Sequence, residues 1–275
     1  MWTQKHEHKY KVERSKATRG YPTDVSDLEW ALLEPLSPGT AATGRPRKTE
    51  FRGVINALRY LARTGCEWRM LPNDFPTYQT VYYWFRRPMH RMLFKTIHDL
   101  ALMLDRMRSG REVVPTAGVV DSQSVKVPAA TESGYDANKK IKGRKRHIAV
   151  DTDGRLLAMN LTPANVADST GALMVLDALK KRWPWVKHLF GDSAYDRRTL
   201  MDKAASMDFT IEVVRKLEGQ QGFAVQPRRW VVERTFGWII RWRRLVRDYE
   251  QRIDVSQNMV YSAMGATLPH RIFSR

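Results

Sequence analysis

The sequence predicts an α/β protein in which an all-helical N-terminal region precedes a mixed β-sheet with flanking helices. Helical patterns fill residues 21–112, and beyond them short apolar strands alternate with helices. The pattern changes at residues 108–116, R-S-G-R-E-V-V-P-T, which is typical of a linker. The 275 residues are therefore expected to form a basic flexible arm at 1–20, a helical domain at 21–112 and an α/β domain at 113–275.

Charge and cysteine content restrict the class of protein. The chain has 47 Lys and Arg against 29 Asp and Glu, a formal net charge of +18, which predicts a polyanionic partner, most simply nucleic acid, with an acidic membrane surface as the alternative. The single Cys66 excludes an intramolecular disulfide framework and a multi-cysteine zinc site. Because no long apolar run or signal-peptide pattern is present, a cytoplasmic protein is expected.

Each predicted helix of the N-terminal region has recognisable ends. Ser26 and Glu29 fit a capping box at the start of a short helix. Residues 49–64 carry an apolar face with helical spacing, and Gly65 is expected to end that helix. Two more helices are expected at about 77–87 and 89–107, after a tight turn. Helices joined by short turns are typical of a helix-turn-helix-like DNA-binding unit, and a plain helical bundle is the alternative.

Basic residues in this region are the first candidates for DNA contact. Arg86 and Arg87 end the second of the three longer helices. The turn ahead of residue 49 contains Arg45, Arg47 and Lys48, which suit DNA phosphates or a minor groove. A solvated linker explains that turn equally well.

The α/β region reads as strands and helices in a regular order. Strands are expected at 118–121, 146–151, 156–161, 188–192 and 209–214, and helices at 168–182, 197–206 and 227–245. Residues 127–144 read as a long excursion rich in glycine and lysine. This order predicts a mixed sheet covered by helices.

Three acids stand at positions where a site is expected. Asp121 and Asp192 each end a short apolar strand, and the carboxyl ends of strands are where sites form in open α/β sheets. Glu233 is the one acid of an apolar, arginine-rich helix, where a lone carboxylate on a mostly buried stripe needs a partner. Clustered carboxylates need a cation, and oxygen ligands suit Mg²⁺ or Mn²⁺. A salt bridge from Glu233 to Arg229 or Arg234 is the alternative.

Further basic residues surround these acids in the sequence. The run from Lys139 to Arg146 is expected to form a loop that grips DNA, with a solvated loop as the alternative; its basic members are Lys139, Lys140, Lys142, Arg144, Lys145 and Arg146. The arginine-rich helix adds the candidates Arg229, Arg234, Arg241 and Arg244.

Four spaced motifs carry a family resemblance: D-S-Q-S-V at 121–125, K-K-I-K-G-R-K-R-H-I-A-V-D at 139–151, G-D-S-A-Y-D at 191–196 and R-R-W-V-V-E-R-T-F-G-W at 228–238. Together they resemble bacterial insertion-sequence transposases of the DDE type, and the insertion-sequence-five family in particular. The resemblance implies a ribonuclease-H-like fold with Asp121, Asp192 and Glu233 as a catalytic triad that binds two Mg²⁺ ions, or Mn²⁺.

A related Tyr-Arg-Glu-Lys signature is only partly met. Arg229 matches its arginine, whereas Gln226 stands at the tyrosine position and Ile240 at the lysine position. The resemblance therefore leaves the group that holds the terminal phosphate open, with Arg241 or Arg244 as substitutes.

The resemblance also implies a function. It predicts a DNA transposase that binds the inverted-repeat ends of an insertion sequence and catalyses metal-dependent strand cleavage and strand transfer. Its partners would be the double-stranded DNA of element ends and target and further copies of itself on DNA, with no membrane and no small-molecule substrate. It would be cytoplasmic and nucleoid-associated when bound to DNA. The alternatives are an inactive or repurposed DNA-binding protein and a nuclease of the same fold.

Overall fold

The computed structural model describes residues 20–39, 49–128, 132–215 and 229–273. The predictions for most of the basic arm and for Arg45, Arg47 and Lys48 therefore lie outside the described residues. The helices are α2 (Asp27–Leu33), α3 (Phe51–Thr64), α4 (Tyr78–Arg86), α5 (Pro88–Arg108), α6 (Asp168–Arg182), α7 (Arg198–Ser206), α8 (Trp230–Ile240) and α9 (Ile253–Phe273). The strands are β1 (Ala117–Lys126), β2 (Gly134–Asp136), β3 (Ile141–Asp151), β4 (Leu156–Pro163), β5 (His188–Gly191) and β6 (Thr210–Val213).

A six-stranded mixed sheet is built from these described strands. Its order is β2-β3-β1-β5-β6, and β4 also pairs with β3. β1, β3 and β4 run antiparallel to one another, whereas β5 and β6 run parallel to β1. The predicted α/β class, a mixed sheet with flanking helices preceded by a helical region, is thus confirmed.

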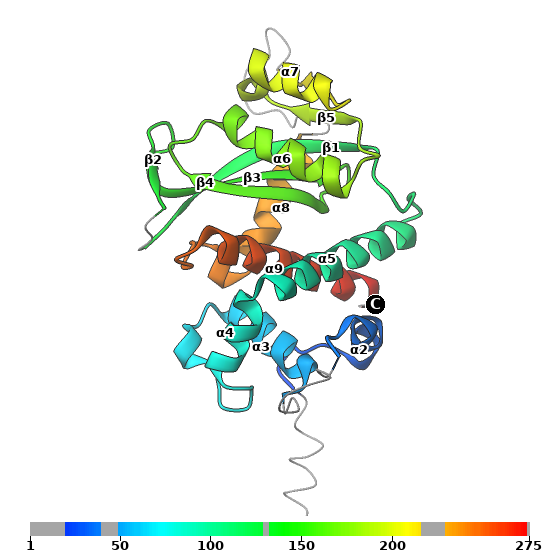
Figure 1. The fold of residues 1–275 in the computed structure, drawn as a ribbon, viewed down its shortest axis with the longest axis vertical. Helices are drawn as coiled ribbons and strands as arrows, with labels where there is room; N and C mark the ends of the chain where they lie inside the picture. The colour runs from blue at the N-terminus through cyan, green and yellow to red at the C-terminus, as the bar shows by residue number, and fades with distance from the viewer. Residues whose placement is uncertain (1–19, 40–48, 129–131, 216–228, 274–275) are drawn as a thin grey trace, which may run out of the picture.

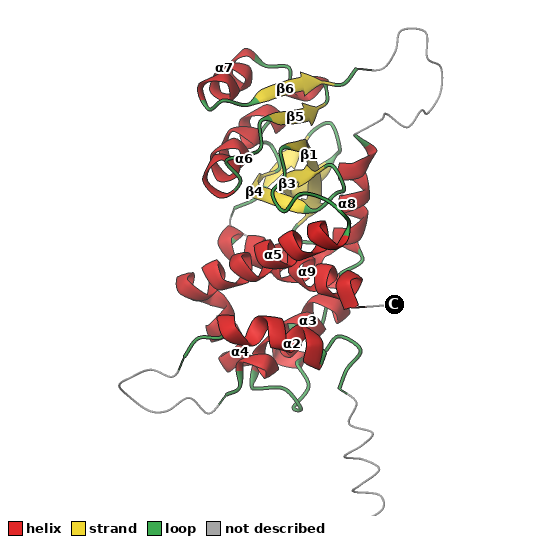
Figure 2. Ribbon diagram, turned by 90° about the vertical axis from the view of Figure 1, so that its right-hand side faces the viewer, coloured by secondary structure: helices red, strands yellow, loops and turns green. Residues whose placement is uncertain are grey.

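Helices cover the sheet on both faces (Figure 2). α6 and α7 pack on one face, over alternate strand residues such as Val120 and Leu189. α8 packs on the other, over Val119, Ile148 and Phe190. Because successive side chains of a strand point to opposite faces, Asp121 shares the α8 side with Val119.

The helical region matches its predicted ends. The Ser26–Glu29 capping box is present, and Gly65 ends α3 in the left-handed conformation with φ 76°. Gly65 suits that position because it lacks the Cβ that disfavours positive φ. None of the described helices is both long and apolar enough to span a membrane.

α9 was not predicted from the sequence, and it joins the two regions. It lies beside α5, in a layer between the sheet and helices α2 to α4 (Figure 1). Asn258 on α9 donates a hydrogen bond to the carbonyl of Phe85 on α4, and the Tyr261 hydroxyl accepts one from the backbone of Met159 on β4. The last helix of the described chain is therefore part of the core of the first helices.

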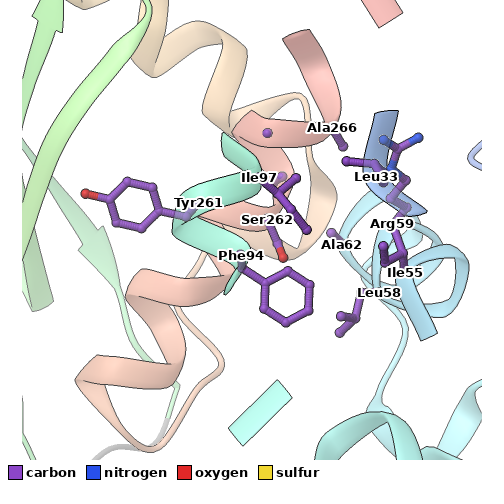
Figure 3. A pocket seen from close by; sticks show the side chains of 12 residues that line it. Leu33, Ile55, Leu58, Arg59, Ala62, Phe94, Ile97, Tyr261, Ser262 and Ala266 are labelled. Atoms are coloured by element: carbon purple, nitrogen blue, oxygen red, sulfur yellow. The ribbon is translucent and has the colours of Figure 1, made fainter. Parts of the chain in front are cut away.

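The packing of α3, α5 and α9 leaves only a small internal gap. This cavity of about 20 Å³ is lined by apolar side chains of all three helices, among them Leu58, Phe94 and Ala266 (Figure 3). A space of that size holds little more than one water molecule. The three helices thus share one continuous core.

Buried ion pairs also connect α5 to the β3–β4 hairpin. Arg106 lies 2.5 Å from Asp151, and Arg155 lies 2.7 Å from Asp105. The side chain of Asp151 is fully buried between Arg106 and Arg155. The predicted linker at 108–116 therefore follows a helix, α5, that these ion pairs attach to the sheet.

The expected basic loop is instead largely a strand. Residues 141–146 belong to β3, where Gly143 pairs with Lys126 of β1. A Cβ on Gly143 would lie 1.9 Å from the Val125 carbonyl oxygen, so the strands approach closely only because this residue is glycine. Gly143, which suggested a loop in the sequence, is therefore needed for the close pairing of β3 with β1.

Candidate active site

The parallel pairing of β1 and β5 places two of the predicted acids side by side. Val119 is paired with Phe190 in this register. Two residues further along each strand direction, Asp121 and Asp192 follow on the same face of the sheet. The carboxylate of Asp192 raises the pKa of Asp121, which also shows that the two groups are close. The prediction that these acids meet at a strand end is therefore supported by the register.

Each of the two carboxylates has a fixed backbone donor. The backbone N–H of Ser122 donates to Asp121 at 2.7 Å, and that of Ala194 donates to Asp192 at 2.9 Å. Asp192 thereby caps the short 3₁₀ turn Ser193–Tyr195 that follows β5. Local hydrogen bonds of this kind hold a carboxylate in one orientation before any ligand arrives.

Asp121 has an elevated pKa. Burial raises the pKa of Asp121 from 3.8 to about 6, and repulsion from Asp192 adds to that shift. The Ser122 hydrogen bond and the charges of Arg229 and Lys139 act in the opposite direction. A carboxyl group in this state gains from a nearby cation, because the cation stabilises its ionised form.

Arg229 provides the cation nearest to these acids among the described residues. Its Nη2 donates to Asp192 Oδ2 at 3.5 Å, and its side chain is 19% exposed. Arg229 immediately precedes α8, so the start of this helix points at the carboxyl end of β5. The arginine of the partly met signature therefore does lie at the predicted site.

Glu233 is not joined to the other two acids. It lies on α8 one turn after Arg229, and its side chain is exposed, because Val231, Val232 and Phe236 form the buried side of this helix. The expectation of a mostly buried stripe around Glu233 is thus wrong. Its salt-bridge alternative is also not seen: within the described parts of the chain, Glu233 makes no ion pair. No group of three His, Cys, Asp or Glu side chains that could hold a metal forms among those residues.

The two strand-end acids nevertheless fit a divalent cation. They offer oxygen donors, which are the ligands that Mg²⁺ and Mn²⁺ prefer. Burial is the main cause of the raised pKa of Asp121 and repulsion from Asp192 adds to it, so a bound cation would stabilise the ionised form of this carboxyl group. Glu233 follows Arg229 by four residues, so the two side chains neighbour each other on one side of α8.

A buried polar chain lies behind Asp121, and the sequence reasoning missed it. The Ser122 hydroxyl donates to Asp168 at 2.7 Å, and Lys145 lies 2.9 Å from the same carboxylate. Burial raises the pKa of Tyr195, and the charges of Asp121, Asp168 and Asp192 raise it further, so the Tyr195 hydroxyl lies near this chain. The signal in the sequence was the Asp-Ser pair that follows both apolar strands, at 121–122 and 192–193. Ser122 connects Asp121 to Asp168 through its backbone N–H and its hydroxyl.

Several basic residues predicted to bind DNA are buried structural groups instead. Arg144 is fully buried, lies 2.8 Å from Asp248 and donates to three backbone carbonyls. Arg244 is paired with Glu250 at 2.7 Å. Lys145 is held by Asp168, and Arg146 is fully buried, with a pKa lowered by burial to about 10. DNA cannot reach side chains in these positions, so the expectation for these four residues is corrected.

Other predicted DNA contacts are accessible. Lys139, Lys140 and Lys142 are exposed at the β2–β3 turn and the start of β3. Exposed positions are also taken by Arg86, Arg87 and Arg241. Arg234 is half-buried and donates to the Asp153 carbonyl at 2.8 Å, so it fixes α8 to the β3–β4 hairpin.

Comparison with known proteins adds family information to this geometry. The family model described as "Transposase DDE domain" matches residues 113–268. The model described as "Putative transposase of IS4/5 family" matches residues 25–98. A putative transposase for insertion sequence element IS402 from Burkholderia cepacia is 35% identical over 124 residues. That match covers 41% of this chain and 56% of the relative, so the chain spans little more than half of that relative's length.

Solved structures give weaker likenesses. The catalytic domain of Mos1 mariner transposase is 10% identical, with a TM-score of 0.32, over 65% of this chain and 89% of that one. A pre-cleavage Mos1 transpososome is 11% identical, with a TM-score of 0.27, over 89% of this chain and 92% of that one. The family model spans more than half of the sequence and includes Asp121, Asp192 and Glu233. The chain therefore belongs to the DDE-domain transposases, with the DDE-domain match over its α/β region and the IS4/5-type match over its helical region.

Proposed function

We propose that this protein is a DNA transposase that binds the inverted-repeat ends of an insertion sequence and cuts and joins DNA strands with divalent cations. The observation that carries the proposal is the pair Asp121 and Asp192, set side by side by the β1–β5 register in a chain of net charge +18. Acids that attract cations, in a protein that attracts polyanions, suit phosphoryl transfer on DNA.

In this mechanism Asp121 and Asp192 would hold the catalytic cations, and Glu233 would be the third ligand. Two Mg²⁺ ions, or Mn²⁺, would supply Lewis-acid activation of the attacking oxygen and stabilise the leaving oxygen. Ser122 and Ala194 keep the two strand-end carboxylates oriented through their backbone N–H groups. Glu233 is exposed on α8, one turn after Arg229, and would be the third residue to hold a cation.

Arg229 is expected to change partner during the same process. It now pairs with Asp192 at 3.5 Å. With a cation held by Asp192, the guanidinium of Arg229 would donate to a DNA phosphate, for which its planar fork is suited. Lys139, whose charge acts on Asp121, would hold the adjoining phosphates.

The partners follow from the same chemistry. Double-stranded DNA, both element end and target, would contact the exposed basic residues of the β2–β3 turn and of α4. Joining two ends needs two active sites, so a homo-oligomer on DNA at the nucleoid is proposed.

The direct test is cleavage of labelled element-end DNA. The wild-type protein should cut with Mg²⁺ or Mn²⁺ and bind without cutting when no divalent cation is present. Asp192→Asn should bind the same DNA and fail to cut. Binding without cleavage in every metal would instead identify an inactive, repurposed DNA-binding protein, whereas cleavage without strand transfer would identify a nuclease of the same fold.

A further inference from the structure

A cavity of about 410 Å³ opens between the helical region and the end of α8, and neither Asp121 nor Asp192 lines it. Its walls come from the segment ahead of α2 and from α2, α3, α9 and the end of α8. Four arginines and two tryptophans dominate the lining: Arg59, Arg63, Arg241, Arg271, Trp238 and Trp242. Pockets of this size commonly bind small ligands or parts of larger ones.

Two of its arginines have no acceptor for their guanidinium groups. Within the part of the chain that the structure describes, neither Arg241 nor Arg271 donates a side-chain hydrogen bond or makes an ion pair. Arg271 lies over the ring of Trp238, with 3.9 Å between its Cζ and the ring centroid. Burial lowers the pKa of Arg271; the charge of Asp105 acts against this, and the charges of Arg155 and Arg234 lower the pKa further. An arginine held among other arginines is stabilised by an anion.

Arg63 belongs to the same set of groups. Its Nη1 donates to the backbone carbonyl of Arg241 at 3.1 Å, and its Cζ lies 5.7 Å from the Trp242 ring centroid. Each of two guanidinium groups thus lies near a tryptophan ring, Arg271 near Trp238 and Arg63 near Trp242. Preorganised guanidinium groups of this kind suit the oxygens of a phosphate.

The acids of the cavity do not neutralise this charge. Glu29 lies 2.9 Å from Arg59, so these two groups compensate each other. Asp24 is the other acid, and burial raises its pKa. Apart from the Arg59–Glu29 pair, the lining thus contains Arg63, Arg241 and Arg271 and only one acid, Asp24, whose pKa is raised.

We propose that this cavity is a binding subsite for a backbone phosphate of duplex DNA, held by Arg63, Arg241 and Arg271. The inference rests on the proposed function and adds to it a place where DNA is held. Arg241 immediately follows α8, the helix that carries Glu233, and Arg63 lies on α3 of the helical region. A phosphate in this cavity therefore connects DNA to both regions at once.

The test is the salt dependence of DNA affinity. Each phosphate contact contributes about 0.9 to the slope of log K against log salt concentration. The double variant Arg241→Gln/Arg271→Gln should lower the magnitude of that slope by about one to two and weaken binding several-fold at low salt. Arg241→Lys/Arg271→Lys, which keeps both charges, should restore most of the slope. Melting temperatures identify any variant that fails to fold.

The matched control is Arg198→Gln, on α7 at the far end of the molecule (Figure 1), with a side chain that is 95% exposed. It should leave the slope within about 0.3 of wild type, because it lies far from the cavity. An unchanged slope for the double glutamine variant, in a wild-type protein that binds DNA, would overturn the subsite and leave the proposed function intact. The subsite would also be overturned if the double glutamine variant bound inorganic pyrophosphate more weakly than wild type but bound DNA equally well. A wild-type protein that does not bind DNA would refute both.

Discussion

The guanidinium of Arg229 lies 3.5 Å from the carboxylate of Asp192, one helical turn ahead of the exposed Glu233. A protein cation thus sits beside the acids that are proposed to bind metal. In the proposed function, Arg229 balances the charge of Asp192 in the metal-free protein, and Glu233 on α8 would be a metal ligand.

Asp121 is expected to destabilise the metal-free protein at neutral pH. Its folded-state pKa of about 6 exceeds the ordinary 3.8, so the folded protein binds the proton more tightly than the unfolded chain. Ionisation therefore lowers the free energy of unfolding as pH rises from about 4 to 6. Asp121→Asn should raise that free energy at pH 7 by up to about 3 kcal/mol and leave it unchanged below about pH 4. Urea denaturation in chelator at both pH values measures this; a variant less stable than wild type at pH 7 would contradict it.

Divalent cations should stabilise the wild-type protein in the absence of DNA. Mn²⁺ binding to Asp121 and Asp192 removes their repulsion, so the melting temperature should rise by a few degrees at pH 7. The rise should shrink as pH falls through about 6, since a protonated Asp121 no longer binds the ion. Calorimetry with and without Mn²⁺ tests this, with Asp177→Asn, an acid on α6 paired with Lys203, as the control that keeps the effect. An equal rise in Asp192→Asn would place the ion elsewhere.

Glu233→Gln should separate folding from catalysis. The exposed side chain makes no ion pair within the described residues, so the melting temperature should change by no more than about a degree. Strand cleavage should fall by several orders of magnitude if Glu233 is a metal ligand, while binding of element ends persists. The measurement is melting temperature, DNA binding and Mg²⁺-dependent cleavage on one preparation. Cleavage near the wild-type rate would refute the three-carboxylate site.

Two neighbouring basic residues of β3 should behave in opposite ways. Arg144→Met leaves the buried Asp248 without its ion-pair partner and removes the donor to three carbonyls, which should cost about 3–5 kcal/mol of stability. Lys142→Met, at an exposed position of the same strand, should leave stability unchanged and reduce DNA affinity together with its salt slope. Denaturation and DNA titration of both variants decide between the roles. A stable Arg144→Met protein with impaired DNA binding would restore the original interpretation of this residue.

Separating the helical region from the rest should abolish its folding. A fragment that ends at residue 112 lacks α9, whose Val255, Met259 and Val260 are buried in the shared core. We expect this fragment to show no cooperative melting and no specific binding of element ends. Circular dichroism and DNA titration of the fragment check this. Specific binding by a folded fragment would support the independent domain that the linker pattern at 108–116 predicts.

Local patterns in the sequence accounted for most elements. The capping box at Ser26 and Glu29, the terminal Gly65 and the helix at 168–182 all depend on neighbouring residues, so they were readable from the chain alone. The strands ending at Asp121 and Asp192 were equally recognisable, because they are short, apolar and followed by an acid.

The predictions that were wrong or missing concern residues whose environment is set by partners far away in the sequence. The charge of Arg144 suggested an exposed loop, and only Asp248, far along the chain, makes its burial favourable. α9 has apolar residues on most sides and was therefore not recognised as a helix that contacts both the sheet and α3. Glu233 was expected to be buried because its neighbours are apolar, but the buried side of α8 faces away from it.

The position of α9 also has a consequence for how the protein is made. Because the whole α/β region is translated between α5 and α9, a growing chain that already contains the first helices has no partner for their apolar faces. Contacts between segments so distant in sequence form late and slow the folding of the element that waits for them. Those helices reach their final packing only after α9 has been synthesised, so the helical region and the α/β region become complete at the same time.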